Sequence, residues 1–77
     1  MKDRTKELVN AYNEATNVEE ARALRQQLFG ALMGEYGAPH FAITFSQTEF
    51  AVDGQAKIIK IQAEKGGTIE VYELGGD

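Results

Sequence analysis

The spacing of apolar residues changes period about halfway along the chain. Up to residue 37 the apolar positions recur every three or four residues, and after residue 40 they alternate with polar positions. The first spacing is typical of an amphipathic helix and the second of a strand with one buried face. The pattern therefore predicts a helical hairpin in residues 1–37 and an antiparallel sheet in residues 38–77.

Two helices are expected in the first half of the chain. Leu8, Tyr12 and Ala15 share one face of the first helix, and Asp3 is its candidate N-cap. Residues 15–17 then interrupt the apolar pattern. A link this short makes the two helices an antiparallel hairpin.

The second helix is expected over residues 18–36. Asn17 and Glu20 have the spacing of a capping box, and Thr16 with Glu19 is an alternative. The apolar stripe of this helix consists of Ala21, Leu24, Leu28 and Leu32, flanked by Phe29 and Ala31.

The second half of the chain predicts three or four strands. Turn signals separate the apolar segments, and the residues before Asp53 form either one long strand or two short ones. A three-residue loop, residues 65–67, pairs Ile61 with Val71. A two-residue loop would instead oppose Ile61 to Tyr72 and scatter the apolar set, so we expect the longer loop.

A four-residue loop, residues 53–56, is expected to pair Phe50 with Ile59. These registers predict an apolar face toward the helices made of Phe41, Ile43, Phe45, Phe50, Val52, Ile59, Ile61, Ile69 and Val71. The predicted fold is therefore a single α+β domain over residues 1–77, with a helical hairpin on one face of a meander (ααβββ or ααββββ).

The same registers predict a small apolar patch on the opposite face of the sheet. Ile58 would oppose Leu74, and Lys60 would oppose Tyr72, with Glu70 on the charged rim. Such a patch is typical of a protein contact, whereas single exposed apolar residues and a fraying last strand are the ordinary alternative. These five residues are the candidate partner-binding site, and the free sheet edges are a second route to a partner.

Glycines, the only proline and the only histidine gather where the two halves of the chain meet. Ala23, Gly30 and Gly34 lie on one side of the second helix, where small residues let another backbone approach closely. A helical glycine costs about 1 kcal/mol relative to alanine, so close packing or self-association is the expected reason for these residues. A poorly formed last turn is the alternative. Gly37 is the expected helix cap, because Pro39 cannot continue a helix.

Composition and charge exclude several classes of function. The chain has 77 residues, no cysteine and one histidine, so we expect no disulfide, metal site or cofactor. Its net charge is −4 and its basic residues are interleaved with acidic ones, which argues against nucleic-acid binding. No apolar run reaches the roughly 18 residues that cross a bilayer. The absence of a secretory signal and of cysteine fits a cytoplasmic protein.

No group of side chains predicts catalysis. His40 and Ser46 are the only histidine and serine, and along one strand they would lie about 20 Å apart. That separation is too large for a base to activate a nucleophile. The glycines lack the spacing of a phosphate-binding loop. Glu19 and Glu20 belong to a first helical turn, where negative charge complements the helix dipole.

These observations predict a small acidic, non-enzymatic protein-binding domain. It would act as a stoichiometric inhibitor or adaptor that occludes a protein partner, in the style of small inhibitors encoded by phages and other mobile elements. The alternative is a structural homodimer or assembly component, suggested by the small size of the chain and its helical glycines. A second alternative is a small-ligand-binding or enzymatic domain around His40 and Tyr36.

Overall fold

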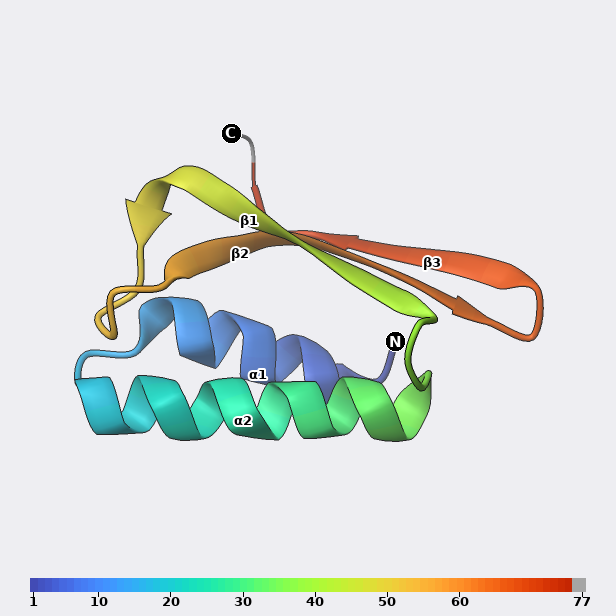
Figure 1. The fold of residues 1–77 in the computed structure, drawn as a ribbon, viewed down its shortest axis with the longest axis horizontal. Coiled ribbons are helices and arrows are strands. Elements are labelled where there is room, and N and C mark those ends of the chain that lie inside the picture. The colour runs from blue at the N-terminus through green and yellow to red at the C-terminus, as the bar shows by residue number, and fades with distance from the viewer. Residues whose placement is uncertain (76–77) are drawn as a thin grey trace.

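The chain forms two helices followed by a three-stranded antiparallel sheet (Figure 1). The computed structural model describes residues 1–75. Helix α1 is Asp3–Glu14 and α2 is Val18–Glu35, and strands β1, β2 and β3 are Phe41–Phe50, Ala56–Lys65 and Thr68–Glu73. The strands lie in the order β1-β2-β3, and both helices lie on one side of the sheet. The predicted α+β fold is confirmed, with a single long strand before Asp53.

Local signals set the ends of α2. The helix begins at Asn17, whose Oδ1 accepts a hydrogen bond from the Glu20 N–H at 2.8 Å, as predicted. Gly37 follows the last turn and adopts a φ of 78°, the left-handed conformation that glycine tolerates. The predicted cap of α1 is wrong, because Lys2 is the N-cap and no side chain caps this helix. Asp3 instead lies in the first turn, where its charge complements the helix dipole.

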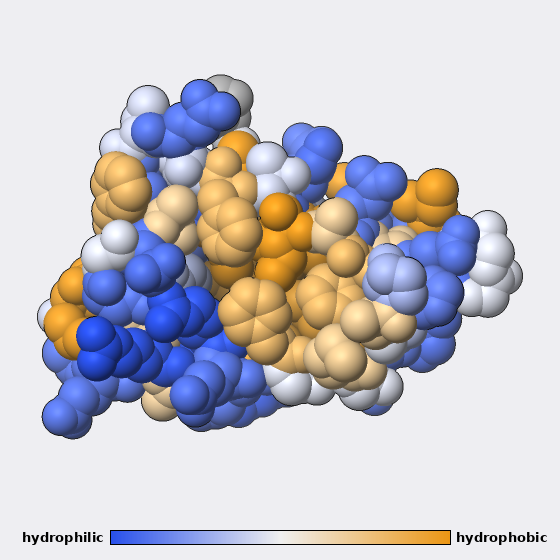
Figure 2. Space-filling model, in the orientation of Figure 1, coloured by the Kyte–Doolittle hydropathy of each residue, from blue (hydrophilic) through white to orange (hydrophobic). Residues whose placement is uncertain are grey.

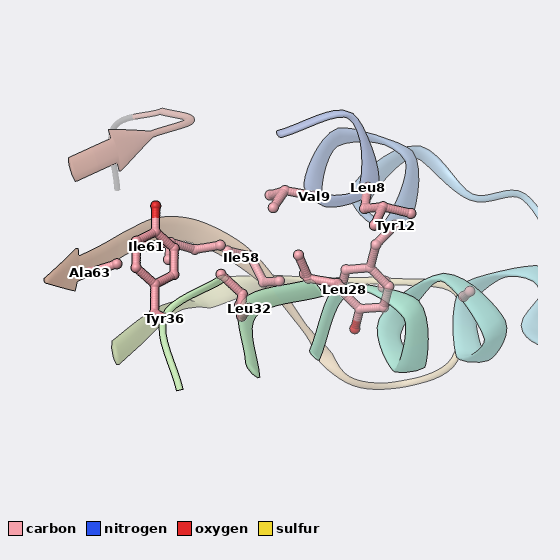
Figure 3. Close-up of a cluster of buried hydrophobic side chains, with 11 residues drawn as sticks. Leu8, Val9, Tyr12, Leu28, Leu32, Tyr36, Ile58, Ile61 and Ala63 are labelled. Carbon is pink, nitrogen blue, oxygen red and sulfur yellow. The ribbon is translucent and has the colours of Figure 1, made fainter. Parts of the chain in front are cut away.

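The hydrophobic core lies between the helices and the inner face of the sheet, which is the face toward the helices. Figure 3 shows Tyr12 and Leu28 at one end of this core and Tyr36 and Ala63 at the other. The buried apolar residues are Leu8, Val9, Tyr12, Ala21, Leu28, Leu32, Tyr36, Ala51, Ile58, Ile61 and Ala63. Each large side chain removed from water contributes about 1.5–3 kcal/mol, so this cluster is the main source of stability.

The β2–β3 hairpin differs by one residue from the predicted register. Its loop contains only Gly66 and Gly67, with φ of 61° and 81°, and Ile61 therefore pairs with Tyr72. Two-residue loops with positive φ at both positions match the right-handed twist of the flanking strands, and glycine adopts them without strain. The turn geometry thus outweighs the apolar pattern that favoured a three-residue loop.

A shift of one residue turns every side chain of β3 to the opposite face of the sheet. Ile69 and Val71 were expected in the core, but they are 60% and 53% exposed on the outer face. Glu70 and Tyr72 face the helices instead.

The β1–β2 hairpin also departs from the predicted register. Thr44 pairs with Lys60 but Phe45 pairs with Ile58, so Ile59 is an extra residue in β2, a β-bulge. The bulge changes the alternation of side chains along β2. As a result Ile58, which was expected on the outer face, is only 1% exposed and lies in the core.

The far end of β1 bends away from β2. Phe50 pairs with Ala56 rather than with Ile59, and residues 46–49 of β1 face only one residue of β2. The Ser46 hydroxyl accepts hydrogen bonds from two backbone N–H groups of this segment, at 3.1 and 2.9 Å, which bends it locally. The core prediction is therefore also wrong for Phe45, Phe50 and Val52, which are exposed.

Candidate functional site

The predicted patch of Ile58, Tyr72 and Leu74 does not form a surface. Ile58 belongs to the core, and Tyr72 and Leu74 are half-buried against it. Lys60 and Glu70 were expected on the same rim but lie on opposite faces of the sheet. The one-residue shift in β3 and the bulge in β2 together account for this error.

Polar partners hold the inward-facing side chains of β3. The Tyr72 hydroxyl accepts a hydrogen bond from Asn10 Nδ2 at 2.6 Å, and Lys6 Nζ lies 5.5 Å from the centre of the Tyr72 ring. Glu70 forms an ion pair with the Met1 amino group. The inner face of β3 is therefore used by the fold itself.

Asn13 of α1 takes the place of a strand beside β2. Its Oδ1 accepts a hydrogen bond from the Ile58 N–H at 3.0 Å, and its Nδ2 donates to the Ile58 carbonyl at 2.7 Å. The paired part of β3 ends with Glu73 opposite Lys60, so Ile58 lies beyond it. The two hydrogen bonds satisfy backbone groups that β3 does not reach.

A buried ion pair anchors the β1–β2 loop to α2. The Asp53 side chain is fully buried, and its Oδ2 lies 2.7 Å from the Arg25 guanidinium. Asp53 Oδ1 accepts hydrogen bonds from the Gln55 N–H at 3.1 Å and from the Tyr12 hydroxyl of α1 at 3.4 Å. Burial and the negative charge of Asp53 raise the pKa of Tyr12. The polar atoms of this cluster point at one another, which indicates a structural role.

A second polar cluster lies where the start of α1 meets the end of α2. The Glu35 carboxylate accepts hydrogen bonds from the Lys2 N–H at 3.1 Å and the Thr5 hydroxyl at 3.3 Å. Burial alone would raise the pKa of Glu35, but the Lys2 N–H, the Met1 amino group and the Thr5 hydroxyl together lower it. Burial and the charge of Glu35 raise the pKa of Tyr36 to about 12.

His40 borders a shallow hollow of about 350 Å³ at one end of the sheet. Its Nδ1 lies 3.8 Å from the Glu64 carboxylate, and both side chains are about half exposed. The hollow is lined by Pro39, His40, Phe41, Ala42, Gln62, Ala63, Glu64 and Ile69. The ionisable side chains of this lining are those of His40 and Glu64.

An apolar surface lies on the side of the molecule where β1 passes above α2 (Figure 1). Arg25, Phe29 and Met33 follow one another at four-residue spacing on one ridge of α2, and Arg25 reaches Asp53 in the loop after β1. Phe29 and Met33 are 39% and 50% exposed, and Phe45 and Phe50 of β1 are 43% and 63% exposed. Figure 2 shows a hydrophobic area in the middle of this side. We call these four exposed residues, two on α2 and two on β1, the α2–β1 surface.

The small residues of α2 also face solvent. Ala23, Gly30 and Gly34 are exposed, and a Cβ placed on either glycine would meet no atom within 4 Å. Close packing within the described part of the chain therefore does not explain these glycines. Residues 26–34 also contain no charged side chain, which is unusual for a helix with an exposed side.

The outer face of the sheet is covered by neither helix (Figure 1). Three rows of residues cross this face: His40, Glu64 and Ile69; Ala42, Gln62 and Val71; Thr44, Lys60 and Glu73. On β1 two of the rows begin with the short side chains of Ala42 and Thr44. On β3, at the edge of the sheet, two rows end with the exposed apolar side chains of Ile69 and Val71.

Reasoning from the sequence missed Asn10, Asn13 and Asp53. Asn10 and Asn13 directly follow the apolar positions Val9 and Tyr12 on the first helix, and nothing in their local sequence indicates their distant partners. Asp53 lies in a turn segment, and nothing in its local sequence distinguishes a buried aspartate from an exposed one.

Comparisons with protein-family models, with curated proteins and with solved structures find no match for this chain. Within residues 1–75, no three histidine, aspartate or glutamate side chains are grouped so that they would hold a metal ion. Neither of the two helices there is long and apolar enough to span a lipid bilayer. The α2–β1 surface and the edge of β3 both present exposed apolar side chains.

Proposed function

We propose that this chain is a small cytoplasmic, non-enzymatic protein-binding domain, an inhibitor or adaptor that acts by covering part of a protein partner. The α2–β1 surface carries the proposal. It presents exposed Phe29, Met33, Phe45 and Phe50 beside a helical segment without charge. Grouped apolar side chains of this kind are typical of protein contacts. Phe29 and Phe45 are the expected anchors, because aromatic side chains contribute strongly to interface energies.

Matched variants test this surface in affinity capture from a lysate of the native host. Phe29→Ser combined with Met33→Ser removes exposed apolar area without touching the core, whereas Val18→Ser removes an exposed apolar side chain at the other end of α2. We expect the double variant to reduce capture of the partner by at least about tenfold. Val18→Ser should capture as well as the unmodified chain.

Circular dichroism and urea unfolding establish that each variant retains the fold. Capture that survives the double substitution contradicts the α2–β1 surface as the binding site. Capture that falls equally with Val18→Ser contradicts it as well, because the loss is then not specific to this surface.

A structural homodimer is a second candidate, favoured by the exposed Gly30 and Gly34 beside Phe29 and Met33. Glycines on a helix let a second helix approach closely, and an aromatic side chain of one copy would fit over a glycine of the other. Sedimentation velocity at micromolar concentrations should then show a dimer that Gly34→Leu dissociates. A monomer at all concentrations removes this candidate.

A further inference from the structure

The backbone of β3 has one side without a neighbouring strand. The Leu74 N–H donates a hydrogen bond to the Ile59 carbonyl at 2.8 Å. In an antiparallel ladder, alternate residues direct their backbone groups toward the neighbouring strand. Counting back from Leu74, the N–H and C=O groups of Ile69, Val71 and Glu73 therefore point away from β2.

These outward groups are open to a new strand. No hydrogen bond to them is found among residues 1–75. Sheet edges are commonly protected by lysine, proline or a β-bulge. β3 contains neither lysine nor proline, and all six of its residues pair with β2 in one continuous register without a bulge. Its charged side chains are the inward-facing Glu70 and the outward-facing Glu73. The opposite edge of the sheet, formed by β1, is less regular, because the pairing of β1 with β2 shifts register twice beyond Thr44.

We propose that β3 accepts an extended segment of a protein partner, which adds to the sheet as a fourth, antiparallel strand. The outward backbone groups would provide hydrogen bonds, and the exposed Ile69 and Val71 would provide apolar contacts on the outer face. This site goes beyond the α2–β1 surface. Because β1 and β3 are opposite edges of the sheet, both sites can be occupied at once.

The charges along this edge select a basic segment. On the outer face of this edge Glu73 is a carboxylate and Glu64 lies beside Ile69, and β3 has no cation. The other carboxylate of β3, Glu70, faces the helices and is paired with the Met1 amino group. Lys60 offsets Glu73 only from the side of β2. Opposite charges directly across two strands are stabilising and like charges are destabilising. A lysine or arginine opposite Glu73 is therefore the favoured partner residue.

The partner segment has a defined pattern. In an antiparallel pair, the residues that oppose Glu73, Val71 and Ile69 follow in that order at two-residue spacing. The preferred segment is therefore basic, any residue, apolar, any residue, apolar. A second copy of this chain is a poorer occupant, because it would bring a second Glu73 carboxylate and no cation to the edge and join two chains that each carry a net charge of −4.

The first test measures amide hydrogen exchange by NMR with a capped peptide that contains Lys-Thr-Val-Thr-Ile. At saturation the peptide should slow exchange of the Ile69, Val71 and Glu73 amides at least about tenfold, while the Glu70 and Tyr72 amides serve as internal references. A matched peptide with glutamate in place of lysine should bind about fivefold more weakly. Equal affinities, or protection that does not include the three outward amides, overturns the proposal. Protection that rises with protein concentration without peptide assigns the edge to a second copy and overturns it too.

Two variants separate backbone pairing from charge. Val71→Pro removes an outward N–H but no hydrogen bond to β2, so the fold should persist while peptide binding falls more than about tenfold. Glu73→Lys should reverse the preference between the two peptides with the backbone unchanged. If Val71→Pro does not fold, this reversal decides the matter alone. An unchanged preference in the Glu73→Lys variant, or normal binding by a folded Val71→Pro variant, contradicts strand addition at β3.

Discussion

Side chains from both helices hold the β1–β2 loop, whereas the β2–β3 loop projects past the end of α2 (Figure 1). In the first loop Asp53 is buried against Arg25 and Tyr12. In the second, Gly66 and Gly67 are exposed and hold the turn through their positive φ angles. Tertiary contacts therefore stabilise one hairpin end, and backbone conformation alone defines the other.

The difference shows how a small domain can divide its sheet between stability and contact. The anchored end fixes the β1–β2 hairpin to the helices, and the projecting end leaves β3 accessible along its outer edge. If this division is correct, substitutions at the anchored end should destabilise the fold strongly, and substitutions in the projecting loop should have small effects.

The largest effect is expected for Arg25→Met. The substitution keeps the length of the side chain but leaves the buried Asp53 carboxylate without its cation. Removing one member of a buried ion pair costs about 3 kcal/mol, and urea unfolding should show a loss of this size. Arg22→Met is the matched control, because Arg22 is exposed on the same helix. A loss below about 1 kcal/mol would mean that the ion pair does not anchor the loop.

Asn13→Ala should be next in size. It removes both hydrogen bonds to Ile58 and leaves a backbone N–H and a carbonyl unsatisfied beside the core. The expected loss in free energy of unfolding is about 2 kcal/mol. Asn10→Ala removes an exposed hydrogen bond to Tyr72 and should cost less than half as much. Equal losses for the two variants would show that α1 does not act as the neighbour of β2 at Ile58.

The pH dependence of stability tests the burial of Tyr36, which packs in the same cluster as Ile61 and Ala63 at the base of the projecting hairpin. Its pKa is raised from 10.0 to about 12, so the unfolded chain ionises first as the pH rises. Its contribution to stability is complete below pH 10 and is lost as the pH rises toward 12, by about 2 kcal/mol at that pH. Urea unfolding near neutral pH and at about pH 11 measures this loss in free energy of unfolding. The loss between the two pH values should be smaller for the Tyr36→Phe variant than for the unmodified chain, because phenylalanine does not ionise. Identical pH profiles would contradict burial of the hydroxyl beside Glu35.

The smallest effect is expected in the projecting loop. Asparagine tolerates positive φ and is common in two-residue hairpin loops, so Gly66→Asn should keep the register. It should also stabilise the fold by about 0.5 kcal/mol, because asparagine restricts the unfolded chain more than glycine does. Gly66→Val is the control and should destabilise the fold, since φ is 61° at this position. Thermal unfolding measures both, and a destabilising Gly66→Asn would contradict the two-residue loop.

Patterns within one element were predicted well from the sequence. The helical spacing, the cap at Asn17 and the glycine after α2 depend on contacts between residues a few positions apart. The order of the elements follows from the same local patterns. The predicted stripe of Ala23, Gly30 and Gly34 lies on the exposed side of α2, and its role in self-association stays a prediction.

Strand register was not predictable from alternation, because the Gly66-Gly67 turn and the partners of distant side chains decide it together. Alternation alone would bury Ile69 and Val71, but Glu70 and Tyr72 can face inward since Met1 and Asn10 supply their partners. Asn10 and Tyr72 are 62 positions apart. The bulge at Ile59 has no local signature either. Because the predicted register turned β3 to the opposite face, the predicted binding patch was assigned to residues that lie in or against the core.

The outward backbone groups of β3 also affect how the protein behaves in concentrated solution. Unprotected strand edges can join copy to copy, and repeated joining builds insoluble fibres. The net charge of −4 that each chain carries at neutral pH keeps copies apart. That protection weakens as the pH falls toward the isoelectric point near 4.9. Acidification should therefore precipitate the protein with the signature of added β-structure, and a mildly alkaline buffer should keep it dispersed.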